Sequence, residues 1–575
     1  MTAFLQAHQD WAFQSGLRNA WLRSLGRRQQ WQALLRHAGS TRDAEIRCYQ
    51  AVAKIRTGAT GQLEHEIKSL WLIGKSQKDA CDPAFKWLAG NGHITPQLSW
   101  RRIDLAMQAG NSSLARYLGR HLPADMQLQL DRYLRLMANP LSALPKALSW
   151  PDKPQTRDML ITAMKRLARR DADAAWRLWN RLDTKFSFSA DQRGPVLHDI
   201  AVYSAVSLDP EAIRRLRAVP ADYRDIQLLQ WQLRAALAVS DWALVMASIT
   251  AMPEQTRNDS RWRYWRARAL AETGQPKTAR KEFERLAAES HFHGFLAADR
   301  LALPYSLCPQ QPQVDPDAIA QLRKQAGIQR ALELKEVELL DFARREWQMV
   351  SRNLDRDGLR AVAALAVENE WHDRAIFALG DSGDRRYYEW RFPLDHQVYV
   401  QQRASQSQLD PAWIFGLMRS ESAMDPGAIS TANARGLMQV TPATARQLAR
   451  NNGISYRSSK QLLEPEFNIM LGTVYLRELL DRFANNPYLV AGAYNAGPEA
   501  VERWLKERPQ LDPDVWIELI PYFETRDYVP RVLAFTTIYD WRLNQTVKRV
   551  SSRMPELNGA AAANQTTRIV CQSAG

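Results

Sequence analysis

Along most of the chain, apolar residues recur three and four positions apart, which is the spacing of one face of an α-helix. Strand-like alternation is scarce up to about residue 390. The clearest unit runs from Trp262 to Leu286, where two apolar faces flank the turn Gly274-Gln275-Pro276. It predicts a helical hairpin similar to a tetratricopeptide unit, without the full consensus. Stacked hairpins predict a mainly all-α fold that begins with a helical-hairpin superhelix, an α-solenoid.

A loose repeat supports this prediction. A polar turn followed by a tryptophan at the start of an apolar helix occurs at Trp31, Trp242 and Trp371. We therefore expect most of the 20 tryptophans to pack between helices.

Breaks in the helical pattern divide the chain. Prolines and polar residues mark linkers near residue 310 and near residue 393, and short polar motifs between short helices follow the second. We expect a helical-repeat domain over residues 1–315, a helical linker domain over 316–394, a third domain over 395–548 and a mostly disordered tail over 549–575.

Length and composition fit a multidomain globular protein. The 575 residues are too many for one core, and 45% hydrophobic with 24% charged residues is ordinary. No stretch approaches the apolar length of a membrane span. The first residues lack the basic region and apolar core of a secretory signal, so the protein is either cytoplasmic or begins after a removed signal.

The net charge of +15 predicts an anionic partner. Nucleic acid, acidic lipid and the acidic bacterial cell wall all qualify. The basic residues are scattered, commonly as pairs such as Arg27-Arg28, which favours a solvated basic surface over a nucleic-acid groove.

The four cysteines have no zinc-site spacing. Cys48 and Cys81 fall within one region and could form a disulfide in an oxidising compartment, whereas Cys308 and Cys571 have no evident partners. We expect no metal and no cofactor.

Glu421 is the first candidate for chemistry. A helix is predicted to start at the Asp410-Pro411 cap and to end before the turn at residues 425–427. The face that carries Glu421 is otherwise apolar, with Ile414, Leu417 and Met418. Burial there raises a carboxyl pKa, and an acid that stays protonated near neutral pH can act as a general acid. The alternative is that Glu421 has a structural role only, as a buried carboxylate with hydrogen-bond partners.

Three further motifs follow Glu421-Ser422: Ala-Arg-Gly-Leu-Met-Gln at 434–439, Ala-Tyr-Asn-Ala-Gly at 493–497 and Glu-Thr-Arg-Asp-Tyr-Val at 524–529. Each alone is weak, because a turn, a helix end or a surface ion pair would explain it. In this order they resemble the catalytic domain of the lytic transglycosylases, specifically the soluble Slt family with its goose-type-lysozyme-like fold. The resemblance extends upstream, through residues 70–82 and 262–265 among others.

The resemblance implies a ring of helical domains carrying a lysozyme-like catalytic domain. It implies that Glu421 acts alone, first as acid and then as base, so that the C6 hydroxyl of N-acetylmuramic acid attacks C1 and a 1,6-anhydro product forms. It also implies substrate-binding roles for Ser430, Gln439, Thr441, Tyr494, Asn495 and Glu524, and a disulfide between Cys48 and Cys81. Two positions depart from the family: Thr441 replaces a frequent Met, and Asp527 a frequent Gly.

The leading hypothesis is thus a periplasmic, exo-acting lytic transglycosylase, a lyase of cell-wall turnover. We expect peptidoglycan glycan strands as its partner, other cell-wall enzymes as further candidates, no nucleic acid, no membrane span and a monomer. A hydrolytic goose-type muramidase, a glycan-binding helical scaffold and a nucleic-acid binder are the alternatives.

Overall fold

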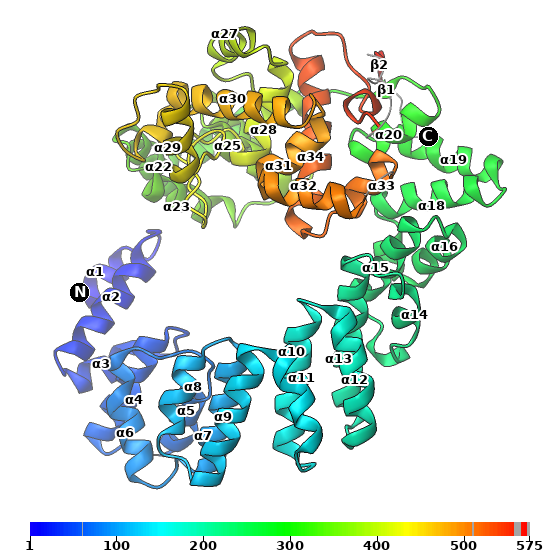
Figure 1. The fold of residues 1–575 in the computed structure, drawn as a ribbon. Coiled ribbons are helices and arrows are strands. Elements are labelled where there is room, and N and C mark those ends of the chain that lie inside the picture. The colour runs from blue at the N-terminus through cyan, green and yellow to red at the C-terminus, as the bar shows by residue number, and fades with distance from the viewer. Residues whose placement is uncertain (60, 509–510, 557–564, 572–575) are drawn as a thin grey trace. The chain divides into compact units, whose positions relative to one another are not determined.

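The computed structural model describes residues 1–59, 61–508, 511–556 and 565–571. Helices account for 69% of the chain, and the two strands are two residues long, so the mainly all-α expectation is confirmed. The chain divides into two compact units, one of residues 1–204 with 214–223 and one of residues 205–213 with 224–575 (Figure 1).

The first unit is a succession of helices in which neighbours along the chain pack together, as α3 with α4 and α7 with α8. Its elements, with the unit boundaries falling inside the last two α-helices, are α1 (Thr2–Ala7), α2 (Gln14–Arg27), α3 (Trp31–Ala38), α4 (Ala44–Thr57), α5 (Leu63–Trp71), η1 (Asp79–Cys81), α6 (Asp82–Gly90), α7 (Pro96–Gln108), α8 (Ser112–Gly119), α9 (Ala124–Ala138), α10 (Pro140–Ala143), η2 (Leu144–Ser149), α11 (Pro154–Ala168), α12 (Ala172–Lys185), η3 (Ala221–Tyr223), α13 (Ala190–Val206) and α14 (Ala212–Arg217).

The second unit begins with further hairpins and continues into the region of the candidate motifs. Its elements are α15 (Ile226–Ala238), α16 (Trp242–Ala251), α17 (Glu254–Arg257), α18 (Ser260–Glu272), α19 (Pro276–Ala287), α20 (Phe292–Arg300), β1 (Tyr305–Ser306), α21 (Pro316–Lys324), α22 (Ala326–Glu336), α23 (Leu340–Ser351), α24 (Arg356–Glu368), α25 (His372–Asp381), α26 (Tyr388–Arg391), α27 (Gln397–Ser407), α28 (Pro411–Ser422), α29 (Pro442–Asn451), η4 (Gln461–Leu463), α30 (Pro465–Arg482), α31 (Pro487–Ala496), α32 (Pro498–Glu507), α33 (Pro513–Glu518), α34 (Phe523–Arg542), η5 (Ser551–Arg553) and β2 (Ile569–Val570).

The predicted hairpin is confirmed as α18 and α19, which turn at Gly274 with a φ of +80° that favours glycine. Helices α3 and α16 begin at Trp31 and Trp242, and Trp371 is the N-cap residue of α25, as predicted.

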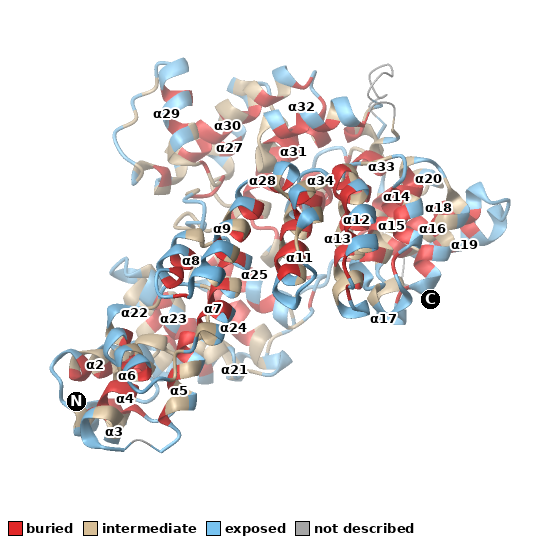
Figure 2. Cartoon of the chain, turned by 60° about the horizontal axis from the view of Figure 1, so that its bottom comes forward, coloured by how far each residue is buried: buried red, intermediate tan, exposed pale blue. Residues whose placement is uncertain are grey.

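Helix α34 is the central packing element of the second unit. Its buried residues run from Thr525 to Asp540, and it packs against α28 and α31 (Figures 1 and 2). A helix buried over such a length can hold side chains of other helices in fixed positions, which matters for the site below.

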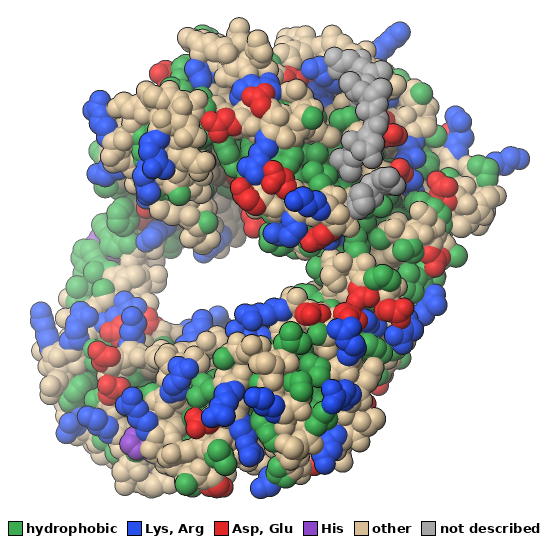
Figure 3. Space-filling model, viewed as in Figure 1, with side chains coloured by type: hydrophobic (Ala, Val, Ile, Leu, Met, Phe, Trp, Pro, Cys, Tyr) green, Lys and Arg blue, Asp and Glu red, His purple; other side chains and the backbone are tan. Residues whose placement is uncertain are grey.

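Lys and Arg side chains on the face shown in Figure 3 are spread over many helices and mixed with Asp and Glu. This distribution fits a solvated basic surface better than a nucleic-acid stripe. In the described part of the chain, no helix is long and apolar enough to cross a membrane.

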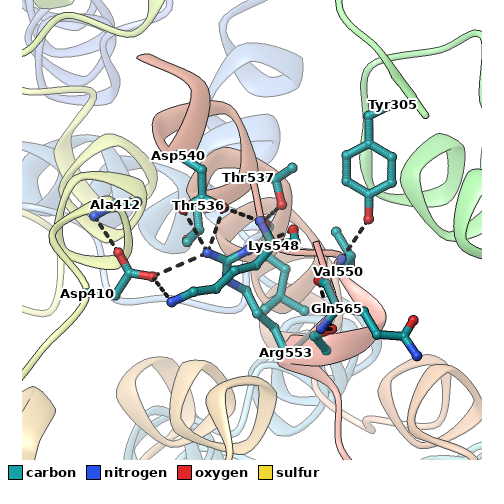
Figure 4. Close-up of polar contacts among 12 residues, drawn as sticks. Tyr305, Asp410, Ala412, Thr536, Thr537, Asp540, Lys548, Val550, Arg553 and Gln565 are labelled. Atoms are coloured by element: carbon teal, nitrogen blue, oxygen red, sulfur yellow. Dashed lines mark hydrogen bonds and ion pairs between the residues drawn. The ribbon is translucent and has the colours of Figure 1, made fainter. Parts of the chain in front are cut away.

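Of the tail over residues 549–575 that the sequence predicts to be mostly disordered, the structure describes 549–556 and 565–571, which make contacts within the second unit, while 557–564 and 572–575 lie outside the described residues. The guanidinium of Arg553 contacts both carboxylate oxygens of Asp540 at 2.8 and 2.9 Å (Figure 4). The Val550 amide donates to the Tyr305 hydroxyl at 2.7 Å. Asp540 is 13 positions from Arg553, and Tyr305 is 245 positions from Val550, so the composition of the tail itself could not reveal either partner.

Disulfides join the cysteines in pairs. Cys48 is bonded to Cys81, and Cys308 to Cys571, although the sequence indicates no partner for the second pair. The second bond lies beside the two-stranded parallel pairing of β1 with β2. A strand of two residues is marginal by itself, and the covalent bond holds it in place.

Candidate active site

Glu421 is the next-to-last residue of α28. The helix starts as the sequence predicts, because the Asp410 side chain accepts a hydrogen bond from the Ala412 amide and Pro411 occupies the first position. It ends at Ser422, where Ala423 and Met424 take left-handed φ values of 53° and 68°. The neighbouring apolar face is fully buried, with Ile414, Leu417 and Met418.

A close approach of α28 to α34 creates the site. A Cβ atom on Gly416 would lie 2.5 Å from Thr536 Oγ1 and 2.8 Å from the Thr536 amide nitrogen, so only glycine fits. The contact brings Tyr528 beside Glu421, and the Tyr528 hydroxyl donates to Glu421 Oε1 at 2.5 Å. Tyr528 lies within a motif that the sequence singles out, yet the sequence assigns it no role.

The environment of Glu421 favours a protonated carboxyl near neutral pH. Burial raises the pKa of Glu421 to about 7, against the hydrogen bond from Tyr528 and the charge of Arg531, which lower it. The Glu524 carboxylate raises the pKa further. Glu421 is therefore poised to give up a proton and to regain one at ordinary pH.

The Gly-Leu-Met-Gln motif forms a loop held by the buried side chain of Asn468. Its amide oxygen accepts from the Met438 amide at 2.7 Å, and its nitrogen donates to the carbonyls of Arg435 and Leu462, both at 2.8 Å. The Gly436 position, at a φ of +75°, leaves no room for a Cβ atom beside Asn468. The loop is thus rigid where it carries Gln439.

Gln439 has a left-handed φ of 48°, and its side-chain nitrogen donates to the carbonyls of Ala428 and Gly436 at 3.1 and 2.9 Å. The same loop is linked to α31, because the Tyr494 hydroxyl donates to the Met438 carbonyl at 2.7 Å. Burial raises the pKa of Tyr494 well above 10, and the charge of Glu421 contributes in the same direction. Tyr494 therefore lies within electrostatic reach of Glu421.

A cavity of about 760 Å³ opens in front of Glu421. Ser430 and Gln439 line it together with Glu421, so the structure brings these three predicted residues to one space. Side chains of α23 and α25 form another wall. Four arginines line this cleft, none of which the sequence singles out: Arg344, Arg374, Arg419 and Arg531.

Asp425 also lines the cleft, but its carboxylate has other contacts. Its Oδ1 accepts from the Gly427 amide at 2.8 Å and from Arg344 Nη2 at 2.5 Å. Asp425 thus belongs to the turn after α28 and to an ion pair. A cleft carboxylate held in this way is poorly placed to activate water.

The other predicted site residues have different surroundings. Thr441 caps α29, accepting from the Thr444 amide at 3.1 Å. The Asn495 side chain accepts from the Thr525 hydroxyl at 2.6 Å, which joins the third motif to the fourth. Glu524 is exposed in the first turn of α34. None of these three is among the residues that line the described cleft.

Asp527 has a structural partner in the helical repeats, since Arg261 Nη2 of α18 donates to its carboxylate. The departure from glycine at this position thus adds an ion pair between α18 and α34. Within the described residues, no three His, Cys, Asp or Glu side chains gather as a metal site requires.

Known families match most of this second unit. The family model of the transglycosylase SLT domain matches residues 398–517, that of the soluble lytic murein transglycosylase L domain matches 321–383, and that of the soluble lytic transglycosylase helical domain matches 519–548.

Whole-chain relatives agree. Soluble lytic murein transglycosylase of Escherichia coli K12 is 31% identical over 549 residues, covering 94% of this chain and 84% of the relative. A solved structure of an inactive mutant of lytic transglycosylase Slt from Pseudomonas aeruginosa has a TM-score of 0.86 at 33% identity, over 96% of this chain and 89% of that one. The 70-kDa soluble lytic transglycosylase of E. coli has a TM-score of 0.84 at 29% identity, over 96% and 89%.

The fold and the matches define an enzyme with a lysozyme-like catalytic domain that cleaves peptidoglycan as a lyase. The chain belongs to the soluble lytic murein transglycosylase family.

Proposed function

We propose that this enzyme cleaves the bond between N-acetylmuramic acid and N-acetylglucosamine without water, with Glu421 as its single catalytic carboxyl group. The observation that carries the proposal is the partly buried position of Glu421 at the wall of the cleft, beside Tyr528, where desolvation raises the pKa of Glu421 to about 7. A neutral carboxylic acid there can protonate the glycosidic oxygen and release the N-acetylglucosamine side of the chain.

The carboxylate formed in this step then accepts the proton of the C6 hydroxyl of N-acetylmuramic acid. The C6 oxygen forms a bond to C1, the bond between C1 and the glycosidic oxygen is broken, and a 1,6-anhydro ring results. Glu421 ends protonated, as it began, so protons balance. The attack is intramolecular and has a high effective molarity, which removes the need for a second carboxylate to activate water.

The surroundings of the other carboxylates support this assignment. Asp425 is held by Arg344 and by the Gly427 amide. Asp341, which also lines the cleft, is exposed to solvent and forms an ion pair with Arg344 at 3.6 Å. Glu524 is exposed outside the described cleft lining. The P. aeruginosa relative described as inactive carries glutamine in place of a glutamate, which also fits dependence on one glutamate.

Substrate positioning is part of the proposal. Ser430 and Gln439 line the cleft beside Glu421 and would hydrogen-bond the sugars, and Tyr494 fixes the Gln439 loop through the Met438 carbonyl. Thr441 would act indirectly, because it caps α29, and Asn495 would act through its hydrogen bond to Thr525 of α34. Glu524 would act through the effect of its charge on Glu421.

We also propose exo-acting cleavage in the periplasm. The exo mode rests on the family resemblance, and the compartment is supported by the two disulfides, which an oxidising environment maintains. We further propose that the helical-repeat, linker and catalytic domains end at residues 315, 394 and 548.

Digestion of purified sacculi tests the reaction. We expect soluble muropeptides whose masses are lower by one water than those of hydrolytic products, and glycan chains that shorten from their ends. Glu421→Gln should abolish release with the fold intact by circular dichroism. Glu466→Gln, at an exposed position of α30, is the matched control and should stay active.

Full-mass reducing ends would replace this proposal with a hydrolytic muramidase mechanism. Equal release by wild type and Glu421→Gln would remove Glu421 from the chemistry.

A further inference from the structure

A second cavity, of about 740 Å³, lies wholly within the first unit. Its walls come from the end of α5, from α6 and α7, and from α8. Aromatic side chains form much of the lining, with Trp71, Phe85 and Tyr117. A space of this size and character accommodates a small organic ligand.

Arg102 of α7 lies in the wall of this cavity and is only 4% exposed. Its guanidinium carbon lies 4.0 Å from the centre of the Trp71 ring and 5.4 Å from that of Phe85. The Arg102 Nε and the Trp71 Nε1 are both buried donors without a hydrogen-bond partner. A ligand cannot reach these two sealed atoms, but the Nη atoms of Arg102 are not sealed and make no described hydrogen bond, so they are the donors that an acceptor in the cavity would meet.

No carboxylate compensates the charge of Arg102 within the described residues. Burial lowers the pKa of Arg102 to about 10, and only Tyr117 acts in the opposite direction. The acidic residue of the lining, Asp82, is exposed and makes no described ion pair with Arg102. Burying an unpaired guanidinium is unfavourable by more than a cation–π contact offsets, so a ligand is the expected partner.

The cavity wall is rigid before any ligand arrives. The Cys48–Cys81 disulfide holds the residue that precedes α6, and the rings of Trp71 and Phe85 meet edge to face at 5.0 Å. A Cβ atom on Gly74 would lie 2.3 Å from the Leu105 carbonyl oxygen, so the loop after α5 lies directly on α7. A rigid wall lowers the entropy lost on binding.

We propose that this cavity binds a short peptide by its carboxylate, with the Arg102 guanidinium as the anion-binding group and the aromatic wall against the apolar part of the peptide. A planar carboxylate can accept two parallel N–H hydrogen bonds from one arginine, whereas phosphate sites generally combine several cations. The stem peptides of peptidoglycan are the peptide carboxylates that an enzyme of this family meets. The cavity would thus hold the substrate polymer by a peptide while another part of it is cleaved.

Calorimetric titration of the full-length protein tests this assignment. The probes are N-acetyl-D-alanyl-D-alanine, its C-terminal amide and inorganic phosphate. We expect the free acid to bind and the amide to bind at least about 30-fold more weakly, because a buried charge pair is lost. Arg102→Met, which keeps the side-chain volume over Trp71, should weaken binding of the acid by a similar factor.

Two further variants keep the test decisive. Arg101→Met changes the exposed neighbour on α7 and should leave binding unchanged. Ala89→Trp fills the cavity from an exposed position of α6 and should abolish binding even if Arg102→Met folds poorly. Equal binding of acid and amide, tighter binding of phosphate, or unchanged binding in both Arg102→Met and Ala89→Trp would overturn the proposal. Since binding is measured without cleavage, the result does not depend on the mechanism assigned to Glu421.

Discussion

The Tyr528 hydroxyl donates a hydrogen bond of 2.5 Å to Glu421 Oε1 across 107 positions of the chain. The bond joins the end of α28 to the second turn of α34, so that α34 holds one of the two carboxylate oxygens of Glu421. It stabilises the charged form of Glu421, while burial destabilises that form more strongly, and the pKa of about 7 is the balance.

Removing the Glu421 charge should stabilise the protein at alkaline pH. The folded-state pKa is about 7 against an ordinary 4.5, so the folded protein keeps a proton that the unfolded chain releases between these values. Wild-type stability therefore falls as pH rises from 4.5 to 7, by about 3 kcal/mol. Glu421→Gln does not titrate and should gain about this much relative to wild type on going from pH 4.5 to pH 8, measured by urea unfolding. A constant difference between the free energies of unfolding of wild type and Glu421→Gln across that range would show that the pKa of the Glu421 carboxyl is not raised.

Loss of the Tyr528 hydroxyl should move the pH dependence of cleavage. Tyr528→Phe removes a hydrogen bond that favours the carboxylate, so the pKa of Glu421 should rise by about one unit further. The alkaline limb of kcat/KM should shift upward by that amount, with a lower maximum because Glu421 is less well held. Tyr522→Phe removes an exposed hydroxyl beside the same helix and is the control. A lower rate with an unmoved limb would assign Tyr528 to packing alone.

Asn468 should be essential to the Gln439 loop. Asn468→Leu leaves the Met438 amide and the carbonyls of Arg435 and Leu462 without partners in a buried place, which should reduce the free energy of unfolding by about 3 kcal/mol or more. Cleavage of sacculi should fall even where the protein is folded. Asn452→Ala, at an exposed helix end, should have a small effect on both measurements. Full activity in Asn468→Leu would separate the loop from substrate positioning.

Glu518 joins the helical repeats to the catalytic region and should dominate local stability. It is 4% exposed, and although burial raises its pKa, Arg261 and Arg234 bring it down to about 2. Glu518→Gln leaves the buried Arg234 guanidinium without its carboxylate and leaves Arg261 with Asp527 alone, and should cost about 3–5 kcal/mol at pH 7. The stability that the charged Glu518 contributes to the wild-type protein is fully present above pH 4.5 and is lost as the pH falls toward 2. The free energies of unfolding of wild type and variant should therefore converge in acid. Exposed Glu389→Gln is the control in the same urea experiment.

The Cys308–Cys571 disulfide should hold the C-terminal segment. It spans 263 positions, and its loss in Cys308→Ser/Cys571→Ser should lower stability by about 3 kcal/mol and expose residues 565–571 to protease. The pair Cys48→Ser/Cys81→Ser should leave C-terminal cleavage unchanged, because that bond lies in the first unit. Resistance of the first variant to protease would mean that the β1–β2 pairing suffices.

The sequence by itself determined the helical class, the hairpin at Gly274, the helix starts near tryptophans and the whole of α28 from its Asp410 cap to Glu421. These features are local: periodicity, caps and turns act within a few residues and are visible in any single segment. The motif order also determined the family, because four short patterns in one order are specific even when each is weak.

Only the tertiary structure decided which residues surround Glu421. Tyr528 and Arg531 come near Glu421 through the packing of α34 on α28 that Gly416 permits, and α23 and α25 supply another wall of the cleft. Nothing near Glu421 in the sequence specifies these neighbours. The same holds for the tail, where Arg553 pairs with Asp540 and Cys571 with Cys308. Contacts between distant segments depend on how whole helices are placed, and the pKa of a buried group depends on every charge and every apolar neighbour that this placement brings near.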